Sequence, residues 1–211
     1  MKKVFMAAVF AVLSSTAVMA QSAAGSVFVK PMVGATLTTL TKADDSKMKF
    51  GLVGGAEVGY QVSDAFAVTG GVLASMQGAK MKDYSEVVAG ETYSVKDAST
   101  SLTYLNIPIL ANYYIVPGLS IKAGIQPGFL LSHKSKATEV TPAGEFKEEE
   151  TSTSGLKKFD FSIPLGLSYE FSDFVIDARY NLGLTKISKS DINKSKNSVI
   201  MLTVGYKIPL N

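Results

Sequence analysis

The sequence contains no cysteine, no tryptophan and a single histidine among its 211 residues. Without cysteine the chain has no disulfide framework, no thiolate zinc site, no cysteine nucleophile and no cysteine to carry a lipid anchor. Its 21 basic and 18 acidic side chains give a net charge of +3, and no basic run is interleaved with aromatic residues. We therefore expect no nucleic-acid partner, no metal site and no cofactor.

No apolar run in the sequence is long enough for a membrane-spanning helix. A positively charged start precedes an apolar run from Val4 to Leu13, and a short stretch of small residues ends at Ala20. A spanning helix needs roughly 20 apolar residues, about twice the length of this run. We predict that residues 1–20 are a signal peptide, the alternative being a buried N-terminal helix, and that residues 21–211 form one exported domain.

Beyond residue 20, apolar side chains recur at every second position, which is the period of a β-strand. Phe50 and Leu52 fall on one face of such a segment, and Gly51 and Glu57 fall on the other. Eight segments show the pattern: 27–37, 50–62, 66–77, 105–115, 119–129, 159–171, 174–183 and 200–208. The sequence therefore predicts an all-β protein of eight strands.

The connections between these segments alternate strictly between short and long. Tight turns are expected at 63–64, 116–118 and 172–173, and long polar loops at 39–49, 81–99, 134–157 and 188–197. Outer-membrane barrels have short periplasmic turns and long external loops. We predict an eight-stranded antiparallel up-and-down transmembrane β-barrel in the cell outer membrane, with the long loops, chiefly 134–157 and 81–99, as its interaction surface.

A soluble β-sandwich or lipocalin-like barrel would show the same alternation with its apolar face turned inward. Two features favour the membrane barrel. The polar face is rich in small residues, which fit the narrow interior of eight strands; they include Gly34, Gly51, Gly55, Gly59, Gly71, Gly124, Gly128, Gly166, Gly183 and Gly205. Aromatic residues also gather beside the short turns and the C-terminus, which predicts a periplasmic aromatic girdle: Tyr60, Phe66, Tyr113, Tyr114, Tyr169, Phe171, Phe174 and Tyr206.

Four prolines fall inside the predicted strands: Pro31, Pro108, Pro127 and Pro164. Each proline removes one hydrogen-bond donor from a ladder of a closed barrel. We expect β-bulges at these positions.

If the apolar face meets lipid, eight charged residues point into the lumen: Lys30, Glu57, Lys122, Lys158, Asp160, Glu170, Asp177 and Arg179. Four are basic and four are acidic, and isolated charges in a narrow lumen are costly, so we expect them to pair. The favoured interpretation is a structural network that fills the barrel. The alternative is a gated polar path, although eight strands leave little room for water.

The sequence offers few candidates for catalysis or ligand binding. His133, beside Ser132, resembles part of a lipid hydrolase site, with Glu139 or Glu145 as the orienting carboxylate. One adjacent serine and histidine is a weak pattern, and a rim residue is the favoured interpretation. The acidic run 148–150 could hold a cation or a partner but is typical of a solvated loop.

Two short strand motifs carry a resemblance to a known family. The segments Tyr104–Leu110 and Phe161–Gly166, with the closing pattern Ala178–Leu184 and then Asn197–Lys207, resemble the PorT-like outer-membrane β-barrel proteins of the Bacteroidota. The resemblance implies a barrel of the OmpX and OmpA type, and one branch of that family takes part in type IX secretion. It also implies an aromatic C-terminal residue for barrel assembly; the chain has Asn211 there, and we expect Tyr206 to serve instead.

These patterns together predict a non-enzymatic outer-membrane protein with a structural or interaction role, in an envelope or secretion complex. The alternatives are a narrow, porin-like solute channel and a lipid-modifying enzyme. We expect a monomer whose partners are outer-membrane lipids, the barrel assembly machinery during insertion, and envelope or secretion proteins.

Overall fold

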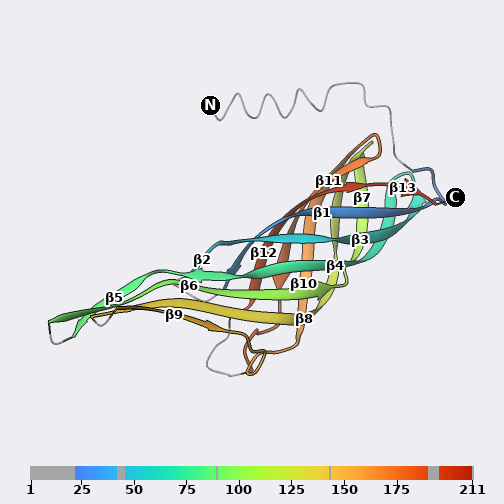
Figure 1. Cartoon of the computed structure of the whole chain (residues 1–211). Helices are drawn as coiled ribbons and strands as arrows, with labels where there is room; N and C mark the ends of the chain where they lie inside the picture. Colours follow the sequence, from blue (N-terminus) through green and yellow to red (C-terminus); the bar gives the residue numbers. More distant parts are fainter. Residues whose placement is uncertain (1–21, 42–45, 89, 143, 190–194, 211) are drawn as a thin grey trace, which may run out of the picture.

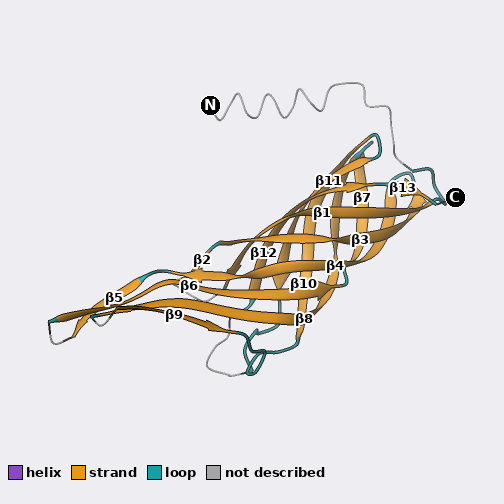
Figure 2. Ribbon diagram, viewed as in Figure 1, coloured by secondary structure: helices purple, strands orange, loops and turns teal. Residues whose placement is uncertain are grey.

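The structure is a computed structural model that describes residues 22–41, 46–88, 90–142, 144–189 and 195–210. The predicted signal peptide at 1–20 and the C-terminal Asn211 lie outside these residues. The described chain is almost entirely β-sheet (Figure 2). No helix among these residues is long and apolar enough to cross a membrane.

The strands in chain order are β1 (Val27–Leu40), β2 (Ser46–Lys47), β3 (Lys49–Ser63), β4 (Phe66–Met81), β5 (Tyr84–Val88), β6 (Glu91–Asn106), β7 (Ile109–Val116), β8 (Leu119–Thr141), β9 (Gly144–Glu150), β10 (Phe159–Phe171), β11 (Phe174–Gly183), β12 (Asn197–Tyr206) and β13 (Ile208–Pro209). Every pairing between them is antiparallel. Figure 1 shows the long strands winding around one barrel.

The ring closes in the order β1, β3, β4, β6 with β7, β8, β10, β11, β12 and back to β1. β6 and β7 are two parts of one strand, because both pair with β4 and both pair with β8. The ring therefore has eight strands. The prediction of an eight-stranded antiparallel barrel is confirmed.

Side chains alternate between the lumen and the outside of the barrel. Along β11, Val175, Asp177 and Arg179 are buried, whereas Phe174 and Ile176 are exposed. Other strands expose the same kind of apolar residue, including Val33, Phe50, Leu52, Val72, Leu131, Leu167 and Leu202. The apolar face therefore points outward, as in a membrane barrel. A soluble sandwich would bury it.

The prolines interrupt ladders without shifting them, so the expectation of bulges is wrong. Pro31 lies at the point where the pairing partner of β1 changes from β12 to β13. Pro108 separates β6 from β7, and Pro164 lies in a gap in the pairing between β8 and β10. Pro127 lies opposite the break at Pro108, where its carbonyl accepts a hydrogen bond from Ile107 N at 2.8 Å. The register is the same on both sides of each break, because a missing donor requires only the loss of one rung.

The short turns lie at 64–65, 117–118 and 172–173, within one residue of the predicted positions. Gly118 has a φ of +82°, a left-handed conformation that suits glycine in a tight turn. The two ends of the described chain lie at this same end of the barrel, where Leu210 N donates to Val27 O at 2.9 Å (Figure 1).

At the opposite end, four strands continue well beyond the ring. We name this part the protruding sheet; it consists of β5, residues 91–96 of β6, residues 135–141 of β8, and β9 (Figure 1). The prediction of loops at 81–99 and 134–157 is therefore wrong over most of their length. A strand with water on both faces needs no apolar face, so its sequence does not alternate between apolar and polar residues and is difficult to recognise as a strand.

Candidate functional site: a filled lumen and a protruding sheet

Five charged side chains, which we name the central network, pair with one another in the middle of the lumen. Glu57 of β3 lies 2.8 Å from Lys30 Nζ of β1 and 2.6 Å from Arg179 Nη1 of β11. Asp177 accepts hydrogen bonds from Arg179 Nε at 2.6 Å and Nη2 at 2.9 Å, and pairs with Lys122 of β8. All five side chains are buried. Because each carboxylate is shared between cations, the network joins four strands across the lumen.

A second ion pair lies nearer the short turns. Lys207 Nζ is 2.8 Å from Glu170 Oε2, and Tyr114 OH donates to the other carboxylate oxygen at 2.7 Å. The Lys207 ammonium also lies 4.3 Å from the centroid of the Phe28 ring. Tyr114 is buried in this cluster, so its assignment to the outer girdle is wrong. Lys207 was missed from the sequence, although the position after outward-facing Tyr206 must point inward.

Towards the protruding sheet, the lumen holds two layers of apolar side chains, together with buried polar side chains that include Gln77, Asn106 and Asn181. One buried layer consists of Met32, Val53, Leu73 and Met201. A second consists of Leu102, Tyr104, Leu130 and Ile187, with Leu40 and Leu156 packed against it. The second layer sits at the mouth and includes side chains from two connecting segments rather than from strands alone.

These two connecting segments fold over the mouth and bond to each other. Lys157 N donates to Ile187 O at 2.8 Å, and Lys189 N donates to Gly155 O at 2.9 Å. Leu156 forms an isolated β-bridge with Ser188. The apolar mouth layer, which we name the mouth plug, is thus held by backbone hydrogen bonds.

The two remaining predicted lumen charges lie near the mouth. Asp160 is buried and pairs in the ladder with Gly128. Lys158 is exposed, so its assignment to the lumen is wrong. It precedes the first residue of β10, and its backbone oxygen accepts a hydrogen bond from Leu130 N of β8 at 2.7 Å.

The predicted girdle aromatics other than Tyr114 lie on the outer wall beside the short turns. Exposed members include Tyr60, Tyr113, Phe171, Phe174 and Tyr206, while Phe66 and Tyr169 are half-buried. Phe174 packs against Phe171 and Tyr206, with ring centroids 5.7 and 5.2 Å apart. Tyr206 OH donates to Asp173 at 3.1 Å. Such a position suits amphipathic rings at the headgroup level.

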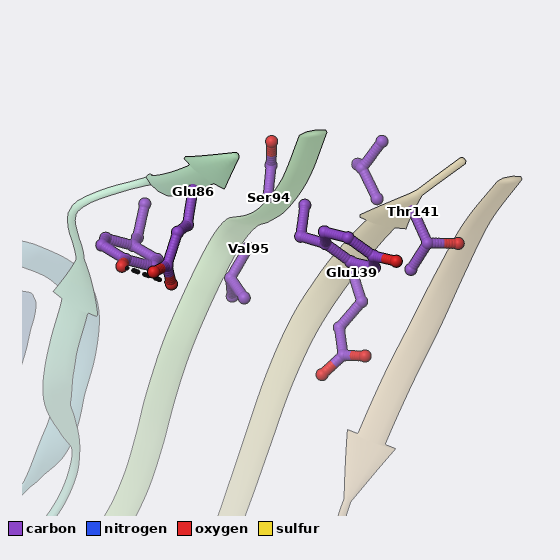
Figure 3. Close-up of a pocket in the computed structure, with 8 residues that line it drawn as sticks. Glu86, Ser94, Val95, Glu139 and Thr141 are labelled. Atoms are coloured by element: carbon purple, nitrogen blue, oxygen red, sulfur yellow. Dashed lines mark hydrogen bonds between the residues drawn. The ribbon is translucent and has the colours of Figure 1, made fainter. Parts of the chain in front are cut away.

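One face of the protruding sheet carries aromatic and acidic side chains. Tyr84, Val95, Glu139 and Phe146 lie opposite one another on four successive strands. Tyr84, Val95 and Glu139, with Glu86, also line a hollow of about 220 Å³ (Figure 3). Tyr84 OH donates to Glu86 at 2.9 Å, and this bond raises the pKa of Tyr84. Exposed rings beside carboxylates are features of a binding surface rather than of a core.

The opposite face of the sheet carries lysines. Lys136 Nζ lies 3.1 Å from Glu149, which also pairs with Lys134. These two hydrogen-bonded lysines lower the pKa of the Glu149 carboxyl. The acidic run 148–150 is exposed and distributed over both faces of β9. In the part of the chain that the structure describes, no three His, Asp or Glu side chains are grouped to hold a metal ion.

The structure does not assemble a hydrolase site around His133. His133 and Ser132 pair with consecutive residues of β6, so their side chains point to opposite faces of β8. His133 Nδ1 lies 2.5 Å from the backbone oxygen of Ser152. Glu139 is six residues farther along β8, roughly 20 Å away in an extended strand, and Glu145 lies on β9, also in the protruding sheet.

A comparison with known families now decides what kind of barrel this is. The family model described as "outer membrane protein beta-barrel domain" matches residues 19–189. The chain belongs to this family. It is therefore an outer-membrane β-barrel protein, as its sequence and outward apolar face predict. No curated protein matches the chain.

Several solved structures are similar to this family member at low sequence identity. Ail, the attachment invasion locus protein of Yersinia pestis, is 17% identical; the match covers 88% of this chain and 99% of Ail, with a TM-score of 0.45. Neisserial surface protein A is 12% identical over 86% of this chain and 97% of its own, with a TM-score of 0.48. OprG from Pseudomonas aeruginosa is 14% identical over 89% and 98%, with a TM-score of 0.40.

Proposed function

We propose that this protein is a non-enzymatic outer-membrane anchor that presents the protruding sheet to a partner in the cell envelope. The observation that carries the proposal is the contrast between the two halves of the molecule. The lumen is filled by ion pairs, buried polar side chains and two apolar layers, whereas the strands outside the ring end in exposed side chains. The molecule thus offers its outer sheet, rather than its interior, for interaction.

The filled lumen argues against the alternative of a narrow solute channel. A hydrated ion would have to separate Glu57 from Arg179, which lie 2.6 Å apart, and then pass the mouth plug. Such buried pairs resist separation, since removing one partner alone costs about 3–5 kcal/mol. The central network is therefore assigned a structural role.

The protruding sheet has the features of an interaction surface. Tyr84, Val87, Tyr93 and Phe146 are large apolar side chains exposed on a rigid scaffold. The resemblance to PorT-like proteins, carried by Tyr104–Leu110 and Phe161–Gly166, supports an envelope or secretion complex as the setting. The proposed partner is a protein of that complex, contacted by a monomer.

The proposal is tested by removing most of the protruding sheet from an intact barrel. Residues 84–96 and 139–146 are each replaced by Asn-Gly, a sequence that closes two-residue hairpins. Photo-cross-linking in cells then compares this trimmed chain with the intact chain. Both chains carry a cross-linker at Thr103 on the barrel wall. A second version of the intact chain carries the cross-linker at Thr92 on the protruding sheet. A mobility shift on heating checks that both barrels fold.

We expect discrete protein adducts from Thr92 and Thr103 of the intact chain, and none of them from Thr103 of the trimmed chain. A cross-linker at the lipid-facing Leu167 is the control and should give none of them. The trimmed chain should be recovered in the membrane but without its partner. If the trimmed chain gives the same adducts as the intact chain, the sheet is not the interaction surface.

A further inference from the structure

Lysines form a row across the outer face of the sheet, at the level where the strands leave the ring. Lys47 of β2 pairs with Lys80 of β4, Lys80 pairs with Ser99 of β6, and Ser99 pairs with Lys136 of β8. Lys136 pairs in turn with Glu149 of β9. Directly opposed residues of antiparallel strands share one face, so these five side chains lie in a single line across five strands.

The row points away from the lumen. Leu102 pairs with His133, and Leu102 is buried in the lumen. Consecutive residues alternate in direction, so Lys134 points outward, and so does Lys136 two residues later. On β4, buried Ala79 points inward and Lys80 outward. The lysines therefore stand on the wall that faces lipid lower down.

The row lies just above the apolar outer wall. On β4, the exposed Met76 precedes Lys80 by four residues, and on β8 the exposed Leu131 precedes Lys134 by three. Met48, next to Lys47 in sequence, is also exposed. Four residues of a strand tilted by about 40° rise roughly 10 Å. A lysine side chain can bend back over part of this height, so its ammonium group reaches the headgroup layer beside the hydrocarbon.

The positive charge of this surface is only partly neutralised within the protein. Lys134 and Lys136 share one carboxylate, that of Glu149. Lys47 and Lys80 are exposed, and neither has an ion-pair partner among the residues that the structure describes. Four lysines thus face one glutamate, which leaves a cationic band at headgroup height.

We propose that Lys47, Lys80, Lys134 and Lys136 form a binding site for the phosphate groups of an anionic lipid in the outer leaflet. The lipid's acyl chains would pack on the apolar wall below, beside Met76 and Leu131, and its phosphate would lie between ammonium groups of adjacent strands. Lysine binds phosphate as a point charge from a flexible stem, so several lysines on one surface can share one headgroup. The site would fix the depth of the barrel in the membrane and hold the base of the protruding sheet.

The test measures lipid binding to the purified full-length protein in detergent by native mass spectrometry. The probes are lipid A carrying two phosphates, the same lipid after dephosphorylation, and inorganic phosphate. The site variant is Lys80→Gln with Lys136→Gln. The matched control is Lys96→Gln with Lys147→Gln, two lysines of the same face that lie opposite Thr138, farther from the apolar wall.

The site variant should bind bisphosphorylated lipid A about thirtyfold more weakly than the unmodified protein, the change expected for two lysines at an anionic lipid surface. The control should bind it normally, and replacing Lys80 and Lys136 by arginine should preserve binding. Heat-dependent gel mobility verifies that each variant is folded.

Three results would overturn the proposal. The site variant could keep full affinity, or the control could lose as much affinity as the site variant. Dephosphorylated lipid A, or inorganic phosphate, could also bind as tightly as the bisphosphorylated lipid. Because these assays use no protein partner, they fail or succeed independently of the proposed anchoring function.

Discussion

Asp177 joins more cations than any other carboxylate of the central network, so its neutralisation should destabilise the barrel. Its two oxygens contact Arg179 at 2.6 and 2.9 Å, pair with Lys122, and lie 3.9 Å from Lys30. The variant Asp177→Asn preserves the shape of the side chain and removes its charge. Three buried cations would then share Glu57 alone.

The expected loss is about 3–5 kcal/mol of unfolding free energy, the usual cost of removing one partner from a buried ion pair. With a urea dependence of roughly 2 kcal/mol per molar, the unfolding midpoint should fall by about 2 M. The chain has no tryptophan for fluorescence, so the assay is urea titration in lipid vesicles, read from the gel mobility of unboiled samples.

Two companion variants make this result specific to charge. Asp173→Asn removes an exposed carboxylate that accepts a hydrogen bond from Tyr206, and should change stability by no more than about 0.5 kcal/mol. Lys122→Met in the Asp177→Asn background restores the original balance of charge and should recover about 0.5–3 kcal/mol relative to additivity. If Asp177→Asn moved the midpoint no more than Asp173→Asn, the central network would not stabilise the barrel.

Three further predictions concern the wall, the sheet and the mouth. Gly34→Ala should destabilise the barrel by about 1–3 kcal/mol in the same urea titration, because the added Cβ would lie 2.0 Å from a backbone oxygen of β12. Gly54→Ala is the control; the nearest atom to its Cβ would be 3.7 Å away, so the unfolding free energy should hardly change. The pKa of the Glu149 carboxyl, measured by NMR, should lie below the usual range for glutamate, and Lys136→Gln should raise that pKa. Because the pKa of Glu149 is lower in the folded state, the ionised carboxylate contributes to stability at neutral pH. This contribution is lost as the pH falls through the folded-state pKa. His133→Ala should leave the extracted lipid profile of cells unchanged, whereas a loss of one lipid modification would support the enzyme alternative.

The alternation of apolar and polar residues was sufficient to predict which side chains of each membrane strand point outward, because the outside of the barrel is apolar wherever it meets lipid. It placed Glu57, Asp177 and Arg179 on the lumen side, and the structure brings them together. Which of these charged residues form ion pairs with one another could not be predicted in the same way. That Lys30 lies opposite Glu57 depends on the register between β1 and β3, which a single strand's pattern does not contain.

The pattern failed where water covers both faces or where an apolar residue lies outside a strand. β9 is exposed throughout and shows no apolar face, so its sequence resembled a loop. Ile187 entered no strand pattern, yet it closes the mouth, because the segment after β11 folds back and bonds to the segment after β9. Such contacts depend on how two loops meet, and this information is not local.

The most direct test of the central claim is single-channel conductance of the purified protein in a planar lipid bilayer. We propose that the lumen is a filled structural core and that the protein acts through its outer sheet. We expect that inserted protein gives no conductance steps, under conditions in which a control porin does. Reproducible steps of uniform size from folded protein would contradict it and would identify the lumen as a path.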